Sequence, residues 1–139
     1  AEAVDLDHFV KRLRNKILTH RSEIVSLDTS DAEGDALLVA YGSVYRCARA
    51  AAREARRSGW SVGSLKLNTL WPLADEELRA LGRGRRAVVV MENNMGQMYP
   101  YLKAEMGRDT EVLFLPPQLI GELHDIDYVL DFLKERVRC

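Results

Sequence analysis

The chain has 139 residues, which is enough for one ordinary domain with a closed core. Its 20 Lys and Arg residues nearly cancel its 21 Asp and Glu residues, so the net charge predicts no nucleic-acid or anionic-membrane partner. The two cysteines and three histidines are scattered singly along the chain, at Cys47, Cys139, His8, His20 and His124. This spacing excludes the closely spaced ligand sets of zinc and iron–sulfur sites. No apolar run approaches the length that spans a bilayer and no basic-then-apolar leader opens the sequence, so we expect a soluble, cytoplasmic protein.

The first predicted element is an amphipathic helix that starts near Leu6. Its apolar residues recur at helical spacing, and they are Phe9, Val10, Leu13 and Ile17. We interpret the basic residues on its other faces as a solvated surface and not as a binding patch. The short apolar segment 24–27 then predicts an edge strand, and the polar stretch 28–35 predicts a loop.

Four apolar runs predict strands, at residues 36–41, 62–67, 87–91 and 112–115. Helical patterns lie between and after them, at residues 44–55, 75–81, 97–106 and 125–137, and Pro100 fits the first turn of its helix. Strands that alternate with helices predict right-handed crossovers and a mostly parallel sheet between helices. The expected fold is therefore α/β, a three-layer α/β/α sandwich that forms one domain over residues 1–139.

Loops that follow the carboxyl ends of parallel strands meet at one edge of the sheet, where ligands usually bind. Gly42-Ser43 could hold an anion at a helix start, but without a phosphate-binding motif we favour an ordinary N-cap. Trp71-Pro72 is equally consistent with a partner anchor and with core packing. Cys47 lies on the apolar stripe of its helix, which favours burial over reactivity.

The segment from Glu92 to Gln97 is the least expected loop, because a carboxylate and two amides, Asn93 and Asn94, follow a strand that should be buried. Polar groups in such a place need partners. They bond to one another, or they face another protein surface or a ligand. Glu92 as a general base would need a matched second group, and the sequence identifies none, so we assign no catalytic residue.

Three stretches together carry a family resemblance, at residues 39–43 (VAYGS), 69–73 (TLWPL) and 91–98 (MENNMGQM). They resemble, in order and separation, the closing domain of 2-oxoacid:ferredoxin oxidoreductase alpha subunits, and the 2-oxoglutarate branch is the most similar. Two positions depart from that pattern, since Asn93 stands where the family commonly has Met, and Gly121 stands alone where paired glycines are common.

The resemblance implies an enzyme that uses thiamine diphosphate with Mg²⁺, coenzyme A and iron–sulfur clusters to make acyl-CoA, carbon dioxide and reduced ferredoxin. It also implies a five-stranded domain like the transketolase carboxy-terminal domain, with one antiparallel strand that agrees with the edge strand expected at 24–27. In the family, thiamine diphosphate lies between an upstream pyrimidine-binding domain and the beta subunit. The resemblance therefore implies that this domain holds no cofactor, metal or catalytic residue.

An assembly role follows from the resemblance, with the upstream pyrimidine-binding domain, the beta subunit and, through the complex, ferredoxin as partners. The candidate interface residues are Trp71, Glu92, Asn93, Asn94 and Gln97. The chain begins at Ala1 and not at Met, so we expect a carboxy-terminal piece of a longer alpha subunit. The alternative is a stand-alone flavodoxin-like module that binds a small ligand, for which only Gly42-Ser43 offers a phosphate loop. A response regulator would need a Lys where Pro116-Pro117 stands, and a thiol enzyme conflicts with the position of Cys47.

Overall fold

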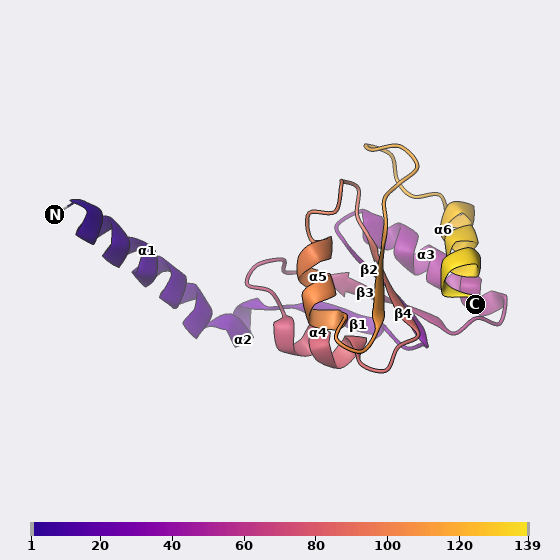
Figure 1. Cartoon of the computed structure of the whole chain (residues 1–139), viewed down its shortest axis with the longest axis horizontal. Helices are drawn as coiled ribbons and strands as arrows, with labels where there is room; N and C mark the ends of the chain where they lie inside the picture. Colours follow the sequence, from indigo (N-terminus) through magenta and orange to yellow (C-terminus); the bar gives the residue numbers. More distant parts are fainter. Residues whose placement is uncertain (1, 139) are drawn as a thin grey trace.

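Five strands form the sheet at the centre of the computed structural model, which describes residues 2–138 (Figure 1). The strands are β1 (Leu27–Asp31), β2 (Ala36–Tyr41), β3 (Val62–Leu67), β4 (Ala87–Met91) and β5 (Glu111–Leu115). The helices are α1 (Glu2–Thr19), α2 (Arg21–Ile24), α3 (Val44–Arg57), α4 (Asp75–Gly82), α5 (Tyr99–Met106) and α6 (Ile126–Phe132), which continues as the π-helical turn η1 (Leu133–Val137).

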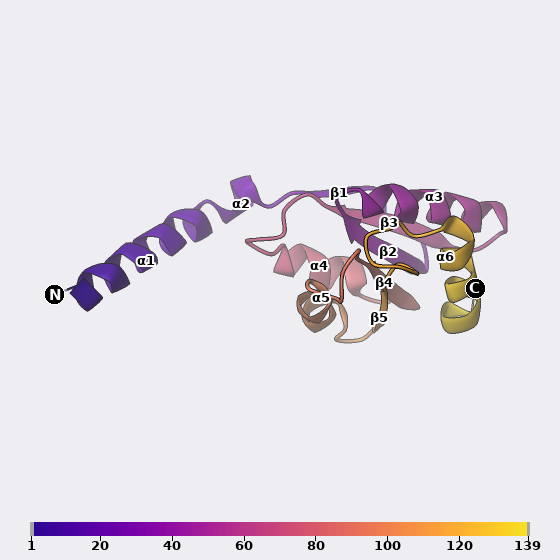
Figure 2. The ribbon, with the colours of Figure 1, turned by 90° about the horizontal axis from the view of Figure 1, so that it is seen from above.

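The strand order is β1-β3-β2-β4-β5, and every neighbouring pair is parallel except β1 with β3. Helices α3 and α6 cover one face of the sheet, and α4 and α5 cover the other (Figure 2). The predicted three-layer α/β sandwich with five strands, one of them antiparallel, is therefore confirmed.

The core consists of two apolar clusters, one on each face of the sheet. Along β2, Leu38 packs toward α3 and α6, whereas Leu37 and Val39 pack toward α4 and α5. Successive side chains of a strand point to opposite faces, so a strand that is covered on both sides is apolar at most positions, and a buried polar residue in it needs a partner, as Ser64 of β3 finds in Asp31. This explains why β2, β3 and β4 follow the predicted bounds residue for residue.

The edge strand lies later in the sequence than we expected. Ile24 ends α2, and β1 begins at Leu27 and runs through a stretch that the sequence predicted to be a loop. An edge strand is paired on one side and faces water on the other, so polar residues are tolerated in it. Asp31, the last residue of β1, also forms an ion pair with Arg56 at 2.9 Å and accepts a hydrogen bond from the Ser64 hydroxyl. These partners stabilise a strand that apolar patterning does not reveal.

Helix α1 extends away from the sheet and its covering helices (Figures 1 and 2). The predicted amphipathic helix is confirmed, but none of the residues from Glu2 to Thr19 is buried. Among residues 2–138, no helix is both long enough and apolar enough to cross a membrane.

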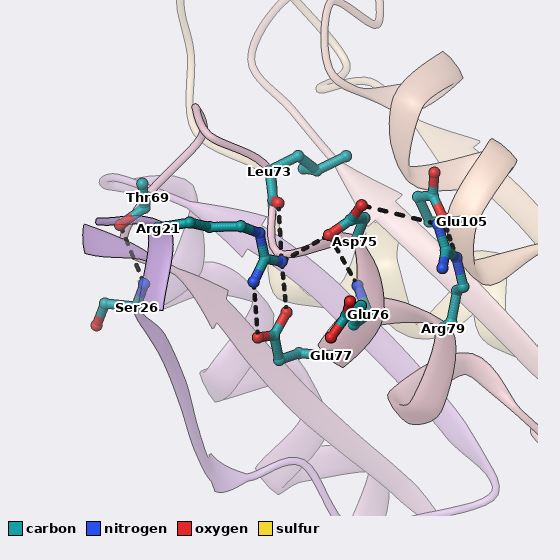
Figure 3. A network of polar contacts seen from close by, with 9 residues as sticks. All are labelled: Arg21, Ser26, Thr69, Leu73, Asp75, Glu76, Glu77, Arg79 and Glu105. Atoms are coloured by element: carbon teal, nitrogen blue, oxygen red, sulfur yellow. Dashed lines mark hydrogen bonds and ion pairs between the residues drawn. The ribbon is translucent and has the colours of Figure 1, made fainter. Parts of the chain in front are cut away.

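Arg21 anchors the base of this helical arm to the body (Figure 3). Its Nη2 lies 2.6 Å from Asp75 Oδ1 and 2.9 Å from Glu77 Oε2, at the start of α4, and it donates to the Leu73 carbonyl at 3.2 Å. The backbone N–H of Ser26 also donates to the Thr69 hydroxyl at 3.1 Å. The chain is thus held to the body on the carboxyl side of α1, while α1 itself projects.

Candidate functional site

The side chain of Glu92 is buried directly after β4, with 1% of its surface exposed. Its Oε1 accepts hydrogen bonds from the Tyr41 hydroxyl and the Met98 backbone N–H, both at 2.8 Å. Its Oε2 accepts from the Tyr99 backbone N–H at 3.0 Å. The first N–H groups of a helix have no acceptor within it, so Glu92 supplies the acceptors at the start of α5. The carboxylate is therefore part of the framework of the loop.

Asn94 completes this network from the same loop. Its Nδ2 donates to the Tyr41 hydroxyl at 3.1 Å, and its Oδ1 accepts from the backbone N–H groups of Gly96 and Gln97 at 2.8 and 3.0 Å. Burial, together with the bond to the Glu92 carboxylate, raises the pKa of Tyr41. The Tyr41 hydroxyl therefore stays protonated at neutral pH and donates a hydrogen bond to Glu92. Glu92 and Asn94 are thus linked through the Tyr41 hydroxyl and through backbone N–H groups, and these bonds fix the loop.

Asn93 joins this loop to the next one at the same edge. Its Oδ1 accepts from the backbone N–H of Gly121 at 2.9 Å, in the connection between β5 and α6. Asn93 stands where the resembled family commonly has Met, and Gly121 is the single glycine where that pattern has two; here these two residues bond to each other. Gln97 is exposed, and its backbone N–H is held by Asn94.

Trp71 lies on the surface, with 59% of its area exposed, so the core-packing alternative is wrong. It lines an open apolar pocket of about 240 Å³ with Leu70, Leu73, Met98 and Tyr101. Tyr101 is itself 62% exposed. An exposed apolar surface that contains Trp and Tyr is typical of protein interaction sites. We call these five residues the Trp71 patch.

A second apolar surface follows β5, and the sequence patterns above did not indicate it. Leu119, Ile120 and Leu123 lie in the connection to α6 and are all more than half exposed. In Figure 1 this connection extends from the same edge of the sheet as the loop after β4. Three large apolar residues in a stretch that begins with Pro116-Pro117 were the available signal, because loops are normally polar.

The predicted N-cap at Ser43 is not formed by its side chain. Ser43 occupies the N-cap position of α3, but its hydroxyl makes no capping bond within residues 2–138. The reason is its backbone, which is helical at φ −65° and ψ −27°, whereas capping side chains usually belong to extended residues. Cys47 is partly buried against the core, and burial raises the pKa of its thiol. This agrees with a packing role for Cys47.

The described residues do not fit the metal groups that the sequence resemblance implies. Between residues 2 and 138, no three or more His, Cys, Asp and Glu side chains are placed to hold a metal ion. The Glu92 carboxylate is occupied on both oxygens by hydrogen-bond donors. Carboxylate oxygens that already accept three hydrogen bonds are poorly available to a cation such as Mg²⁺, which requires a near-octahedral set of oxygen ligands.

The strand order and the helix layers define a three-layer α/β unit, and solved structures share it. A 2-oxoglutarate:ferredoxin oxidoreductase from Magnetococcus marinus has a TM-score of 0.73 at 20% identity, over 94% of this chain and 23% of that one. A split-gene transketolase has a TM-score of 0.66 at 19% identity, over 81% of this chain and 41% of that one. At such identities the likeness establishes the fold.

Sequence comparison establishes the family. The pyruvate:ferredoxin oxidoreductase core domain II model matches residues 34–129, and this chain belongs to that family. The 2-oxoglutarate synthase subunit KorA of Methanothermobacter marburgensis is 36% identical over 128 residues, which are 90% of this chain and 33% of that protein. The resemblance seen in the sequence is thus confirmed, and the chain spans about a third of the length of this curated relative.

Proposed function

We propose that this chain is an assembly domain, without catalytic groups of its own, of a 2-oxoacid:ferredoxin oxidoreductase. One observation carries the proposal. At the carboxyl edge of the sheet, the polar side chains of Glu92 and Asn94 are both bonded to Tyr41, while Trp71 and Tyr101 of the Trp71 patch are exposed. The edge therefore resembles an interaction surface more than an active site.

The bonds of Glu92 argue against its use as a general base. A base must offer a free oxygen to the proton that it removes. Glu92 already accepts three hydrogen bonds, and its side chain is only 1% exposed, so a substrate has little access to the acceptor position that is left on Oε2. A structural carboxylate at the start of α5 explains both the burial and the three bonds.

The enzyme that we propose oxidises 2-oxoglutarate to an acyl-CoA and carbon dioxide and passes electrons to ferredoxin. The similarity to a 2-oxoglutarate synthase subunit supports this substrate. Thiamine diphosphate, Mg²⁺, coenzyme A and the iron–sulfur cluster would be held by other parts of the enzyme. The partners of this chain would be the pyrimidine-binding domain of the same subunit and the beta subunit.

The Trp71 patch is the part of the candidate interface that we expect to contribute most to docking. Trp and Tyr supply a large contact area with few rotatable bonds, and anchors of this kind dominate binding free energies. Glu92, Asn93 and Asn94 would act indirectly by keeping the neighbouring loops in place. Gln97 is exposed and would lie at the rim of the contact.

The test is to express the chain with and without the pyrimidine-binding region and the beta subunit. Thiamine-dependent oxidation of 2-oxoglutarate is measured with an electron acceptor, beside a branched-chain 2-oxoacid as an alternative substrate. We expect activity in the assembled form and none in the 139-residue chain. Activity or tight thiamine diphosphate binding by the chain alone would refute the proposal. Tight flavin or phosphate binding would support the flavodoxin-like alternative.

A matched pair of variants tests the docking surface. Trp71→Ala should reduce co-purification with the other parts, whereas Lys134→Ala, an exposed change on η1, should not. Equal recovery of both variants would show that the Trp71 patch is not the contact.

A further inference from the structure

The connection between β5 and α6 is closed at its base by two hydrogen bonds. The buried ring of His124 lies with its Nε2 2.8 Å from the carbonyl of Leu115, the last residue of β5. The Tyr128 hydroxyl, on α6, donates to the Pro116 carbonyl at 2.9 Å. Both bonds join the outgoing strand to the returning chain. Residues 117–123 therefore form a loop whose two ends are fixed.

The tip of this loop is held as well. The Glu122 backbone N–H donates to the Leu119 carbonyl at 3.0 Å, which closes a turn. Asn93 Oδ1, from the loop after β4, accepts from the Gly121 backbone N–H at 2.9 Å. A loop that is already ordered loses less conformational entropy when a partner binds it. The connection is thus preorganised for a contact.

The same loop turns its largest apolar side chains to solvent. Leu119, Ile120 and Leu123 are 63%, 57% and 51% exposed, respectively. We call these three residues the Leu119 surface. Clustered apolar side chains on an exposed surface mark sites that another protein covers. The fixed loop and its apolar tip together have the form of a docking element.

The sequence around the Leu119 surface is acidic. Residues 109–133 contain no Lys or Arg. Glu122 is exposed, and among residues 2–138 it has no ion-pair partner. Asp125 and Asp127, in contrast, line a groove together with two arginines of α3. A surface that covers the loop is therefore complementary in charge if it places a basic group beside Glu122.

We propose that the Leu119 surface inserts into an apolar pocket, rimmed by Lys or Arg, on the beta subunit of the enzyme. This inference rests on the proposed function, because that function supplies the second subunit. It adds a contact that is separate from the Trp71 patch and states which partner makes it.

The direction in which α1 leaves the body separates the two partners. Arg21 bonds to the carbonyl of Leu73, which belongs to the Trp71 patch. The pyrimidine-binding domain that we propose upstream therefore joins this chain close to that patch. In Figure 1 α1 leaves at the left, beside α4, whereas the loop projects at the top, next to α6, and Figure 2 also shows them apart. A subunit that is not attached through α1 is therefore the better occupant of the Leu119 surface.

Binding of the beta subunit to the alpha subunit that contains this chain tests the contact, measured by sedimentation velocity over a dilution series. Leu119→Ser should weaken binding about tenfold, because it removes an apolar anchor. Glu122→Lys should weaken binding about threefold, and the loss should shrink in high salt. Gln118→Ser, an exposed polar change in the same loop, is the control and should stay within about twofold of the parent.

Asn93→Ala tests whether the fixed conformation of the loop matters. The Leu119 surface stays intact, but the Gly121 N–H loses its acceptor. Hydrogen exchange of the Gly121 amide should become faster, and binding of the beta subunit should weaken about threefold. Asn93→Asp keeps an acceptor oxygen at this position and should restore the slow exchange and the binding.

The outcomes separate this inference from the proposed function. Unchanged binding in Leu119→Ser, with a parent alpha subunit that does bind the beta subunit, overturns the inference and leaves the proposed function standing. A parent alpha subunit that does not bind the beta subunit overturns both. If Leu119→Ser unfolds, Glu122→Lys decides the question, because it changes only an exposed charge, and binding equal to that of the parent at low salt contradicts the contact.

Discussion

The hydroxyl of Tyr41, the last residue of β2, donates a hydrogen bond of 2.8 Å to the carboxylate of Glu92, which directly follows β4. Strands β2 and β4 are neighbours in the sheet, so this bond joins two adjacent strand ends. Asn94 donates to the same hydroxyl, and Glu92 also holds the start of α5. Three elements therefore depend on one partly buried polar network at the edge that we propose as an interface.

Tyr41→Phe removes the hydroxyl from this network. Glu92 keeps its two backbone donors, but Asn94 loses an acceptor. We expect the free energy of unfolding to fall by about 1–2 kcal/mol, measured by urea denaturation. Tyr101→Phe removes a hydroxyl from a residue that is 62% exposed and should have almost no effect. Equal stabilities of the two variants would show that the network contributes little.

Truncation of the two tryptophans to Ala should change the free energy of unfolding by very different amounts. Trp60 is partly buried against the core cluster under α3, whereas Trp71 is 59% exposed. We expect Trp60→Ala to lower the free energy of unfolding by about 2–3 kcal/mol and Trp71→Ala to change it by less than about 0.5 kcal/mol. Thermal and urea unfolding of the isolated chain measure both. A large loss of stability in Trp71→Ala would mean that the aromatic ring supports the fold.

His124 should make stability depend on pH. It is 3% exposed, its Nε2 lies 2.8 Å from the Leu115 carbonyl, and within residues 2–138 its Nδ1 has no hydrogen-bond partner. Burial lowers the pKa of His124 below its ordinary value of 6.5. The folded state therefore favours the neutral ring. This contribution to stability is complete above pH 6.5 and is lost as the pH falls through the lower pKa of the folded state.

The measurement is the slope of the unfolding free energy against pH between neutral and mildly acidic conditions. One such group contributes at most about 1.4 kcal/mol per pH unit. His124→Gln should reduce the slope, whereas His8→Gln, on the exposed face of α1, should leave it unchanged. An unchanged slope in His124→Gln would assign the pH dependence to other groups.

Arg21→Ala should loosen the base of the α1 arm (Figure 3). Two carboxylates and one carbonyl lose their partner, but the site is partly open to solvent, so we expect a loss of roughly 1 kcal/mol or less. The difference from the parent chain should shrink in high salt, because ions screen exposed charges. Arg57→Ala breaks an exposed pair with Glu54 and is the control. A difference that does not depend on salt would assign the effect to packing of the Arg21 stem.

Much of the fold could be predicted from the sequence, and the reason is local. A strand covered on both faces has few positions for a polar residue, so the mainly apolar runs that form β2, β3 and β4 indicate where these strands begin and end. The helices follow from apolar residues at helical spacing. Family membership likewise follows from short stretches such as residues 91–98, whose order along the chain is itself sequence information.

The tertiary structure decided where polar and apolar side chains find their partners. The polar strand β1 forms because β3 offers it a free edge, and no local pattern in its own sequence indicates that edge. Glu92 is a framework group because Tyr41, 51 residues earlier, lies beside it. The exposure of Trp71 depends on which surfaces the rest of the fold covers. Local spacing determines backbone conformation, whereas burial and hydrogen bonding depend on residues that are distant in sequence and adjacent in space.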